Sequence, residues 1–99
     1  MRIIGGKFKN KKLSFPENLI TRPLKDRVRE NIFNILSHSN KIDISINDLE
    51  ILDLYAGTGS FGLECISRGS KHVTFVENNS EALKNLKLNI KNLNIENKT

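Results

Sequence analysis

The amino-acid sequence predicts an α/β fold built on a parallel sheet. After residue 48, strand-like and helix-like segments alternate, which is typical of parallel strands joined by right-handed crossovers. A glycine-rich turn joins the first of these strands to the next helix, as in open sheets that bind ligands at the carboxyl ends of their strands. The chain has 99 residues, so one domain at most is expected.

Residues 1–15 are expected to form a basic, extended arm. Ile3 and Phe8 favour strand structure, and Gly5-Gly6 permits a bend. Asn10 can adopt the left-handed conformation of a turn, which predicts a small hairpin that the Pro16-Glu17-Asn18 segment ends.

A helix is expected over residues 24–38, with Pro23 suited to its first turn. Its apolar stripe is predicted from the spacing i, i+4, i+7 and i+8, at Val28, Ile32, Ile35 and Leu36. The polar residues 39–48 are expected to form a loop.

Two strand–helix units follow this loop. Residues 49–55 predict a buried strand, and residues 60–68 a short helix that Gly69 closes. Residues 73–76 predict a second strand, and Ser80 is the expected N-cap of a helix to about Leu93. The expected buried stripe of this last helix is Leu83, Leu86 and Ile90.

The positive charge lies in the first third of the chain. The net charge is +5, from 16 basic and 11 acidic residues. Residues 1–30 hold nine basic and three acidic residues (+6), whereas residues 31–99 hold seven and eight (−1). Such a basic segment predicts a polyanionic partner. The alternative is a solvent-exposed basic face that only makes the protein more soluble. Arginines suit phosphate contacts by their bidentate geometry, but on a helix they can instead pair with Asp26 and Glu30.

Composition excludes several other classes. One cysteine, Cys65, excludes an intramolecular disulfide framework and a cysteine-based zinc cluster, and it is expected to be a small buried residue. No metal site is expected, because His38 and His72 have no partners at ligand spacing. Apolar runs are too short to span a bilayer, and a reducing cytoplasm is the expected compartment.

The segment Asp53-Leu-Tyr-Ala-Gly-Thr-Gly-Ser-Phe-Gly62 carries the chemistry. Its glycines fit the dinucleotide pattern G-x-G-x-x-G, and Glu77 lies 20 residues after Gly57, where a carboxylate can accept hydrogen bonds from ribose hydroxyls. An NAD-dependent oxidoreductase is therefore one interpretation. Asp53 favours S-adenosylmethionine instead, because a buried carboxylate needs a partner and this ligand is cationic. A purely structural turn is the remaining alternative.

Several motifs together resemble the bacterial 16S rRNA guanine-N2 methyltransferases. They run from Met1 to about Asn89: MRIIGGK at the start, Thr21-Arg-Pro, the segment Asp26–Leu36, Asp53–Glu64, Ser67-Arg-Gly69 and Phe75-Val-Glu77. The resemblance implies a Rossmann-like methyltransferase fold that binds S-adenosyl-L-methionine and methylates a guanine amine in 16S rRNA or the small ribosomal subunit. By position, the cofactor residues would be Asp53, Gly57, Gly59 and Glu77.

One family motif has no counterpart here. The family carries Asp/Asn-Pro-Pro-Tyr/Phe after its fourth strand, where it grips the target amine, and the only prolines of this chain are Pro16 and Pro23. No catalytic residue is therefore assigned, and the chain is expected to be about the first half of the fold and inactive alone. A missing C-terminal half is an expected partner; a non-catalytic RNA- or cofactor-binding module is the alternative.

The resemblance also suggests a division of the chain. Residues 1–23 are the expected RNA-docking extension, and residues 24–99 the partial cofactor domain. Taken with the charge distribution, it gives six candidates for contact with RNA: Arg2, Lys7, Lys9, Arg22, Arg27 and Arg29.

Overall fold

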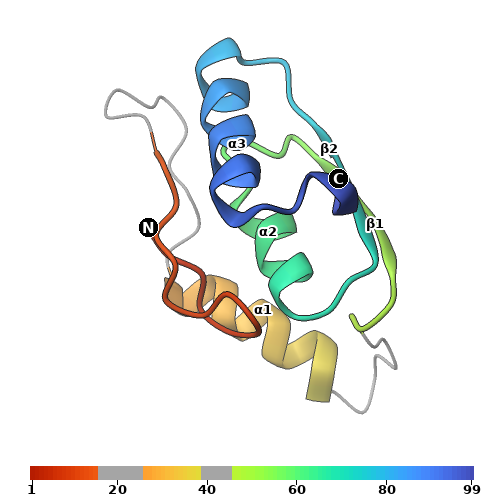
Figure 1. Cartoon of the computed structure of the whole chain (residues 1–99). Coiled ribbons are helices and arrows are strands. Elements are labelled where there is room, and N and C mark those ends of the chain that lie inside the picture. Colours follow the sequence, from red (N-terminus) through yellow and green to blue (C-terminus); the bar gives the residue numbers. More distant parts are fainter. Residues whose placement is uncertain (16–25, 39–45) are drawn as a thin grey trace.

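The fold consists of two parallel strands with helices against them (Figure 1). The computed structural model describes residues 1–15, 26–38 and 46–99. Its elements, in chain order, are α1 (Asp26–His38), β1 (Glu50–Leu54), α2 (Ser60–Ser67), β2 (His72–Val76), α3 (Ser80–Leu93) and the 3-10 turn η1 (Glu96–Lys98). The predicted order of strands and helices is confirmed, and the boundaries that fall on described residues differ by at most one residue. Pro23, Arg22 and the proposed division at residue 23 lie outside the described residues.

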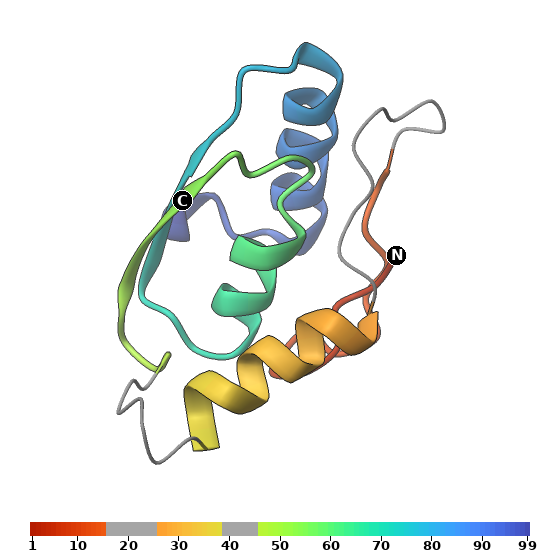
Figure 2. The ribbon, with the colours of Figure 1, turned by 180° about the vertical axis from the view of Figure 1, so that it is seen from behind.

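The two strands pair in parallel, from Glu50 opposite His72 to Leu54 opposite Val76. Helices α2 and α3 lie on one side of this sheet in both views (Figures 1 and 2). The other side is open: the side chains of Leu52, Leu54 and Val76 are 61%, 57% and 47% exposed. The prediction that β1 is buried is therefore wrong for one of its faces, because no described element covers it.

The core lies between the helices, the sheet and the arm. Ile3 of the arm, Phe33 of α1, Leu63 of α2 and Val73 of β2 are all fully buried in one cluster. The Phe33 ring stacks on that of Phe61, with centroids 5.1 Å apart. Residues that are far apart in sequence therefore form a single core.

Cys65 is fully buried, as predicted. Burial raises the pKa of its thiol to about 12, with smaller contributions from Asp53 and Glu64. The side chain is therefore a neutral thiol at physiological pH.

The predicted hairpin of the arm is confirmed. The backbone N–H of Ile3 donates to the Lys11 carbonyl at 3.0 Å, and that of Leu13 donates to the Met1 carbonyl at 3.0 Å. Asn10 has φ 70°, in the left-handed conformation that the turn requires. Because Ile3 and Leu13 are buried, the arm is part of the core and not a loose tail.

The predicted apolar stripes of two helices are confirmed only in part: Leu86 is buried, and Ile32, Leu36, Leu83 and Ile90 are partly buried. In α1 the buried side chains are Arg29 and Phe33, whereas Val28 and Ile35 are exposed. In α3 they are Ala82, Leu86, Asn89 and Leu93. Hydropathy alone cannot identify Arg29 or Asn89, because each is buried against polar partners from another part of the chain.

The N-cap of α3 is also corrected. The Oδ1 atom of Asn79 accepts the Ala82 N–H at 2.9 Å, so Asn79, and not Ser80, caps the helix. Gly69, with φ 105°, follows the last turn of α2, as predicted.

A buried carboxylate holds the arm against α2. The fully buried Glu64 accepts the backbone N–H groups of Ile4 and Gly5, each at 2.9 Å. Arg68 donates to the same carboxylate at 2.9 Å, and the Arg29 Nε lies 3.8 Å from it. The negative charge of Glu64 is therefore compensated by hydrogen-bond donors and positive charges from the arm, α1 and the end of α2, although the carboxylate has no access to water.

The arm also approaches the backbone of α2 closely at Gly6. The Lys7 N–H donates to the Ser67 carbonyl at 2.7 Å, and Gly6 has φ 77°. A Cβ atom at Gly6 would lie 2.0 Å from that carbonyl oxygen. Only glycine permits this contact.

No helix among the described residues is long and apolar enough to cross a membrane.

Candidate functional site

Glu77 and the glycine-rich turn meet at the carboxyl ends of the two strands. The Oε1 atom of Glu77 accepts the Gly57 N–H at 2.8 Å, and Oε2 accepts the Asn79 N–H at 2.8 Å. These N–H groups, that of Asn79 first, lower the pKa of the Glu77 carboxyl. The structure thus brings Glu77 next to the glycine-rich turn, and the lowered pKa keeps its carboxylate ionised at the carboxyl end of the sheet.

Asp53 lies beside them on β1, half-buried. Its Oδ2 atom accepts the Gly62 N–H at 3.1 Å. Burial raises the pKa of the Asp53 carboxyl, the Gly62 N–H opposes this rise, and the negative charge of Glu77 adds to it. A half-buried carboxylate with a shifted pKa near the carboxyl end of a strand is a candidate ligand-binding group.

The glycines of the turn have different roles. Gly57 has φ 61°, and a Cβ atom built on it meets nothing within 4 Å, so its backbone borders open space. At Gly59 (φ 93°) a Cβ would lie 2.4 Å from the Leu86 side chain, and at Gly62 it would lie 2.3 Å from the Phe75 ring. Gly57 therefore leaves room for a ligand, whereas Gly59 and Gly62 let the turn and α2 pack closely.

Sequence reasoning missed Asn89, which supports this turn from α3. Its side chain donates to the Thr58 carbonyl at 3.1 Å, between Gly57 and Gly59. The available signal was its position: the buried residues of α3 follow the spacing 82, 86, 89 and 93, and Asn89 is the polar member.

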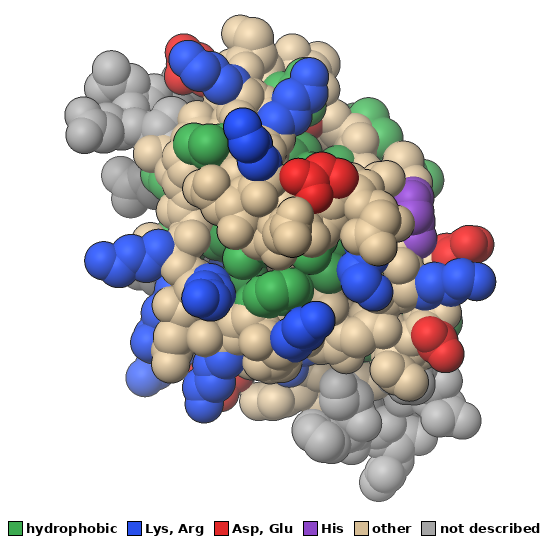
Figure 3. All heavy atoms as spheres, in the orientation of Figure 1, with side chains coloured by type: hydrophobic (Ala, Val, Ile, Leu, Met, Phe, Trp, Pro, Cys, Tyr) green, Lys and Arg blue, Asp and Glu red, His purple; other side chains and the backbone are tan. Residues whose placement is uncertain are grey.

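The candidates for RNA contact do not form one group. Arg2, Lys7 and Lys9 are exposed on the arm, and Arg27 is exposed on α1. Figure 3 shows Lys and Arg side chains gathered over the arm, at the lower left of that face, and others over α3. Arg22 lies outside the described residues.

Arg29 is a correction. It is fully buried, and its guanidinium donates to the Arg2 carbonyl and faces Glu64. This arginine joins α1 to the arm, so it is not available to a nucleic acid. Its pairing with Glu64, 35 positions later in the sequence, could not be predicted from spacing along one helix.

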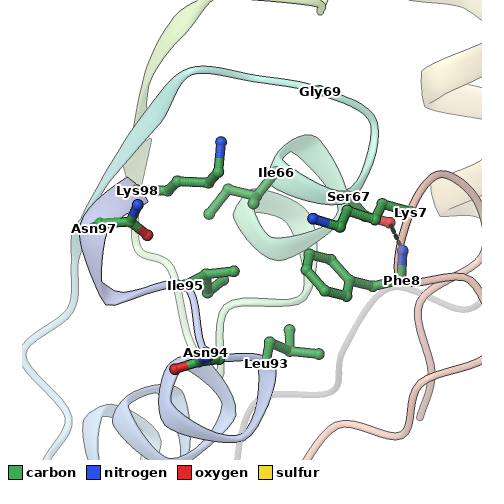
Figure 4. A pocket seen from close by; sticks show the side chains of 10 residues that line it. All are labelled: Lys7, Phe8, Ile66, Ser67, Gly69, Leu93, Asn94, Ile95, Asn97 and Lys98. Carbon is green, nitrogen blue, oxygen red and sulfur yellow. Dashed lines mark hydrogen bonds between the residues drawn. The ribbon is translucent and has the colours of Figure 1, made fainter.

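A pocket of about 390 Å³ lies between the arm, the end of α2 and the segment that runs from the end of α3 to η1 (Figure 4). Lys7 and Phe8 of the arm, Ile66 of α2 and Ile95 and Lys98 near η1 are among its lining residues. It contains none of the predicted cofactor residues. Among the described residues, no group of three or more His, Cys, Asp or Glu side chains could hold a metal ion.

The family model described as "conserved hypothetical protein 95" matches residues 1–99. The chain belongs to this family. It is 42% identical over 77 residues to the Escherichia coli K12 protein named ribosomal RNA small subunit methyltransferase D, covering 78% of this chain and 36% of that protein. The Haemophilus influenzae protein of the same name is 39% identical over 93 residues, covering 94% of this chain and 45% of that protein.

Two solved structures have folds similar to that of this chain. The one described as "putative methyltransferase yhhF from Escherichia coli" has a TM-score of 0.80 and 35% identity, over 98% of this chain and 48% of that chain. A hypothetical protein from Thermus thermophilus has a TM-score of 0.74 and 33% identity, over 92% and 48%. The family member described here therefore has a partial Rossmann-like methyltransferase fold, as predicted.

These comparisons favour the methyltransferase interpretation over the NAD-dependent oxidoreductase. The chain spans about half the length, or less, of the curated relatives that it matches.

Proposed function

We propose that Asp53, Gly57, Gly59 and Glu77 form the S-adenosylmethionine site of an rRNA methyltransferase that modifies a guanine N2 amine in 16S rRNA. The observation that carries this proposal is the Glu77 carboxylate, fixed by the Gly57 and Asn79 N–H groups at the end of β2. The names of the relatives support the rRNA substrate, and the resemblance of the motifs supports the guanine amine.

The described residues fit this ligand. Each Glu77 oxygen accepts one backbone N–H and keeps a lone pair for a ribose hydroxyl. Asp53 supplies a carboxylate for the ligand's cationic groups, and the open space at Gly57 lets the ligand approach the turn. When bound, the ligand supplies a methyl group on a sulfonium; these residues hold and orient it.

The arm is the proposed RNA-docking surface. Arg2, Lys7 and Lys9 of the arm are exposed, and so is Arg27 on α1. Lysine and arginine contacts to phosphates carry no sequence information, so these residues would position the RNA and not select the guanine.

We assign the acceptor site to the part of the full-length relatives that this chain does not span. The Pro-Pro motif that the family resemblance implies is absent from these 99 residues. A C-terminal half is thus a proposed partner, and the described chain would be a cofactor- and RNA-binding module without it.

Replacing Glu77 with alanine tests the cofactor site. We expect the S-adenosylmethionine affinity of Glu77→Ala to fall by about 1–3 kcal/mol, because the Gly57 and Asn79 N–H groups and the ligand hydroxyls lose their acceptor. Isothermal titration calorimetry on the folded chain measures this change. The exposed Glu96→Ala variant makes the same change in charge outside the site and should bind like the unmodified chain. Equal affinity in all three proteins would contradict the assignment.

A further inference from the structure

The side chain of Asn89 connects the cofactor turn to the basic arm. It is 1% exposed, on the buried face of α3 among Ala82, Leu86 and Leu93. Its Oδ1 atom accepts the Ser14 N–H at 2.5 Å, and its Nδ2 atom donates to the Ser14 carbonyl at 3.1 Å. The carboxamide thus pairs with both backbone groups of Ser14, as a neighbouring strand would.

The second Nδ2 hydrogen is directed to the turn. It meets the Thr58 carbonyl at 3.1 Å, and Thr58 is buried between the two positive-φ glycines. The next residue toward the N-terminus, Gly57, donates to Glu77. The Asn89 side chain therefore forms hydrogen bonds with backbone groups of both the arm and the turn. Both of its N–H hydrogens and its oxygen have partners.

We propose that Asn89 is a positioning residue of the cofactor site, and that it links the conformation of the turn to docking of the arm. The inference rests on the proposed function only in naming S-adenosylmethionine as the ligand of the turn. The Ser14 and Thr58 carbonyls each need a donor, and the Ser14 N–H needs an acceptor. A carboxamide supplies all three, whereas a side chain of the same shape without the NH2 group does not. A ligand that orders the turn should also order the arm at Ser14, and the reverse.

The same helix offers a matched control. Asn85 lies one turn before Asn89, and its Oδ1 accepts the Ser14 hydroxyl at 2.5 Å, while its Nδ2 donates to the Glu81 carbonyl. Asn85→Ala therefore removes a contact with the arm but none of the hydrogen bonds to the turn. Asn89→Ala removes both, and Asn89→Asp keeps the shape but places a carboxylate oxygen against two carbonyls.

Hydrogen exchange tests the proposal without any ligand. In Asn89→Ala and Asn89→Asp, we expect exchange in residues 56–59 to accelerate about tenfold or more, the effect of losing a buried hydrogen bond. Asn85→Ala should leave the turn unchanged, and β1 and β2 should stay protected in all variants. The proposal is overturned if Asn89→Asp exchanges like the unmodified chain, if Asn85→Ala has the same effect on the turn, or if protection is lost throughout the sheet.

Calorimetry with S-adenosylmethionine gives the functional measurement. We expect the Kd to rise about five- to tenfold in Asn89→Ala, more in Asn89→Asp, and not in Asn85→Ala. A role in packing alone would make the isosteric Asp variant milder than the Ala variant, which would overturn the proposal. If the unmodified chain does not bind the cofactor, the proposed function fails, and hydrogen exchange still decides the role of Asn89. If the unmodified chain binds and both Asn89 variants bind equally well, only the positioning role fails.

Discussion

The pKa values of the two carboxyl groups in the candidate site, Glu77 and Asp53, are shifted in opposite directions. The N–H groups of Asn79 and Gly57 lower the pKa of Glu77, so this residue stabilises the folded chain above its ordinary pKa of 4.5. That contribution is lost as the pH falls through the lowered folded value. Burial raises the pKa of Asp53 above 3.8, so ionised Asp53 destabilises the fold, and this penalty disappears as the pH falls through the raised value.

The raised pKa of Asp53 predicts a pH-dependent cofactor affinity. A cation beside Asp53 favours its ionised form, so S-adenosylmethionine affinity should fall as the pH is lowered from neutrality toward 3.8. Binding in this range should release protons, which calorimetry in two buffers of different ionisation enthalpy detects. The Asp53→Asn variant should bind more weakly at neutral pH and lose this proton release. The same proton release in the Asp53→Asn variant would show that another group is responsible.

Single residues also show where sequence-based prediction stops. Asp53 and Glu77 could be identified because each lies at the end of a predicted strand, and parallel strands bring these ends together. Arg29 and Asn89 could not, because their partners are 35 and 75 positions away in the sequence. The hydropathy of a polar residue is the same whether it is exposed to water or buried against a partner that is distant in sequence, so a hydropathy pattern cannot distinguish the two cases.

At the scale of elements, α2 links the arm to the glycine-rich turn. Gly59 precedes its first residue, and Glu64 near its end holds the backbone of Ile4 and Gly5. The helix itself was predictable from its glycine boundaries, and the hairpin of the arm from its strand and turn residues, but the packing of the arm against the helix was not. Its docking depends on a backbone contact at Gly6 that no sequence pattern indicates.

Removing the buried carboxylate should be costly for stability. In Glu64→Ala, Arg68 and the two arm N–H groups lose their hydrogen-bond acceptor, and the buried Arg29 guanidinium loses the opposite charge that it faces. We expect the free energy of unfolding to fall by about 3–5 kcal/mol, as for other buried ion pairs that lose one partner. Urea denaturation measures this loss, and the exposed Glu30→Ala change on α1 is the control. An unfolding midpoint equal to that of the control would contradict the role of Glu64.

The arm should provide most of the affinity for RNA. Deleting it would remove Ile3 and Leu13 from the core, so charge neutralisation is the cleaner change. Replacing the exposed arm lysines with glutamine should weaken binding to a fluorescent oligouridine and flatten its salt dependence, by about 0.7 in slope per lost phosphate contact. These lysines are Lys7, Lys9, Lys11 and Lys12.

A second set of lysines serves as the control for this experiment. Neutralising four exposed lysines elsewhere changes the net charge equally and should affect binding less; they are Lys71, Lys84, Lys87 and Lys91. If both sets reduce the salt slope by the same amount, the RNA affinity follows net charge, and the arm is not the docking surface.

At the scale of the whole molecule, one face of the sheet is covered by none of the described elements. Leu52, Leu54 and Val76 are exposed on it, and Tyr55 is 92% exposed after β1. Apolar surfaces of this kind mark sites of association, and the free edges of a two-stranded sheet can accept further strands. Sequence-based prediction gave the layers of the fold, but not this open face, because β1 has the apolar character of a strand covered on both sides.

We expect the 99 residues alone not to transfer methyl groups to small-subunit RNA. Without an acceptor site, the guanine amine is not oriented, and the lost advantage of a held geometry can reach about 7–11 kcal/mol. The measurement is incorporation of tritium from labelled S-adenosylmethionine, with and without an added C-terminal half from a full-length relative. Glu77→Ala, assayed alone and with the same half, is the control. Methyl incorporation by the lone chain above that control would contradict the prediction.

The docking of the arm also sets an order of events during synthesis. The arm leaves the ribosome first, but its partners Glu64 and Asn89 follow 60 and 75 residues later. At about 5–20 residues per second, Ile4 and Ser14 are therefore synthesised roughly 3–15 seconds before Glu64 and Asn89, their hydrogen-bond partners. During that interval the arm is an unpaired segment with five positive charges and no negative one in its first 12 residues. The cationic segment of the nascent chain is therefore exposed before the glycine-rich turn has been synthesised, and before Asn89 can connect the arm to that turn.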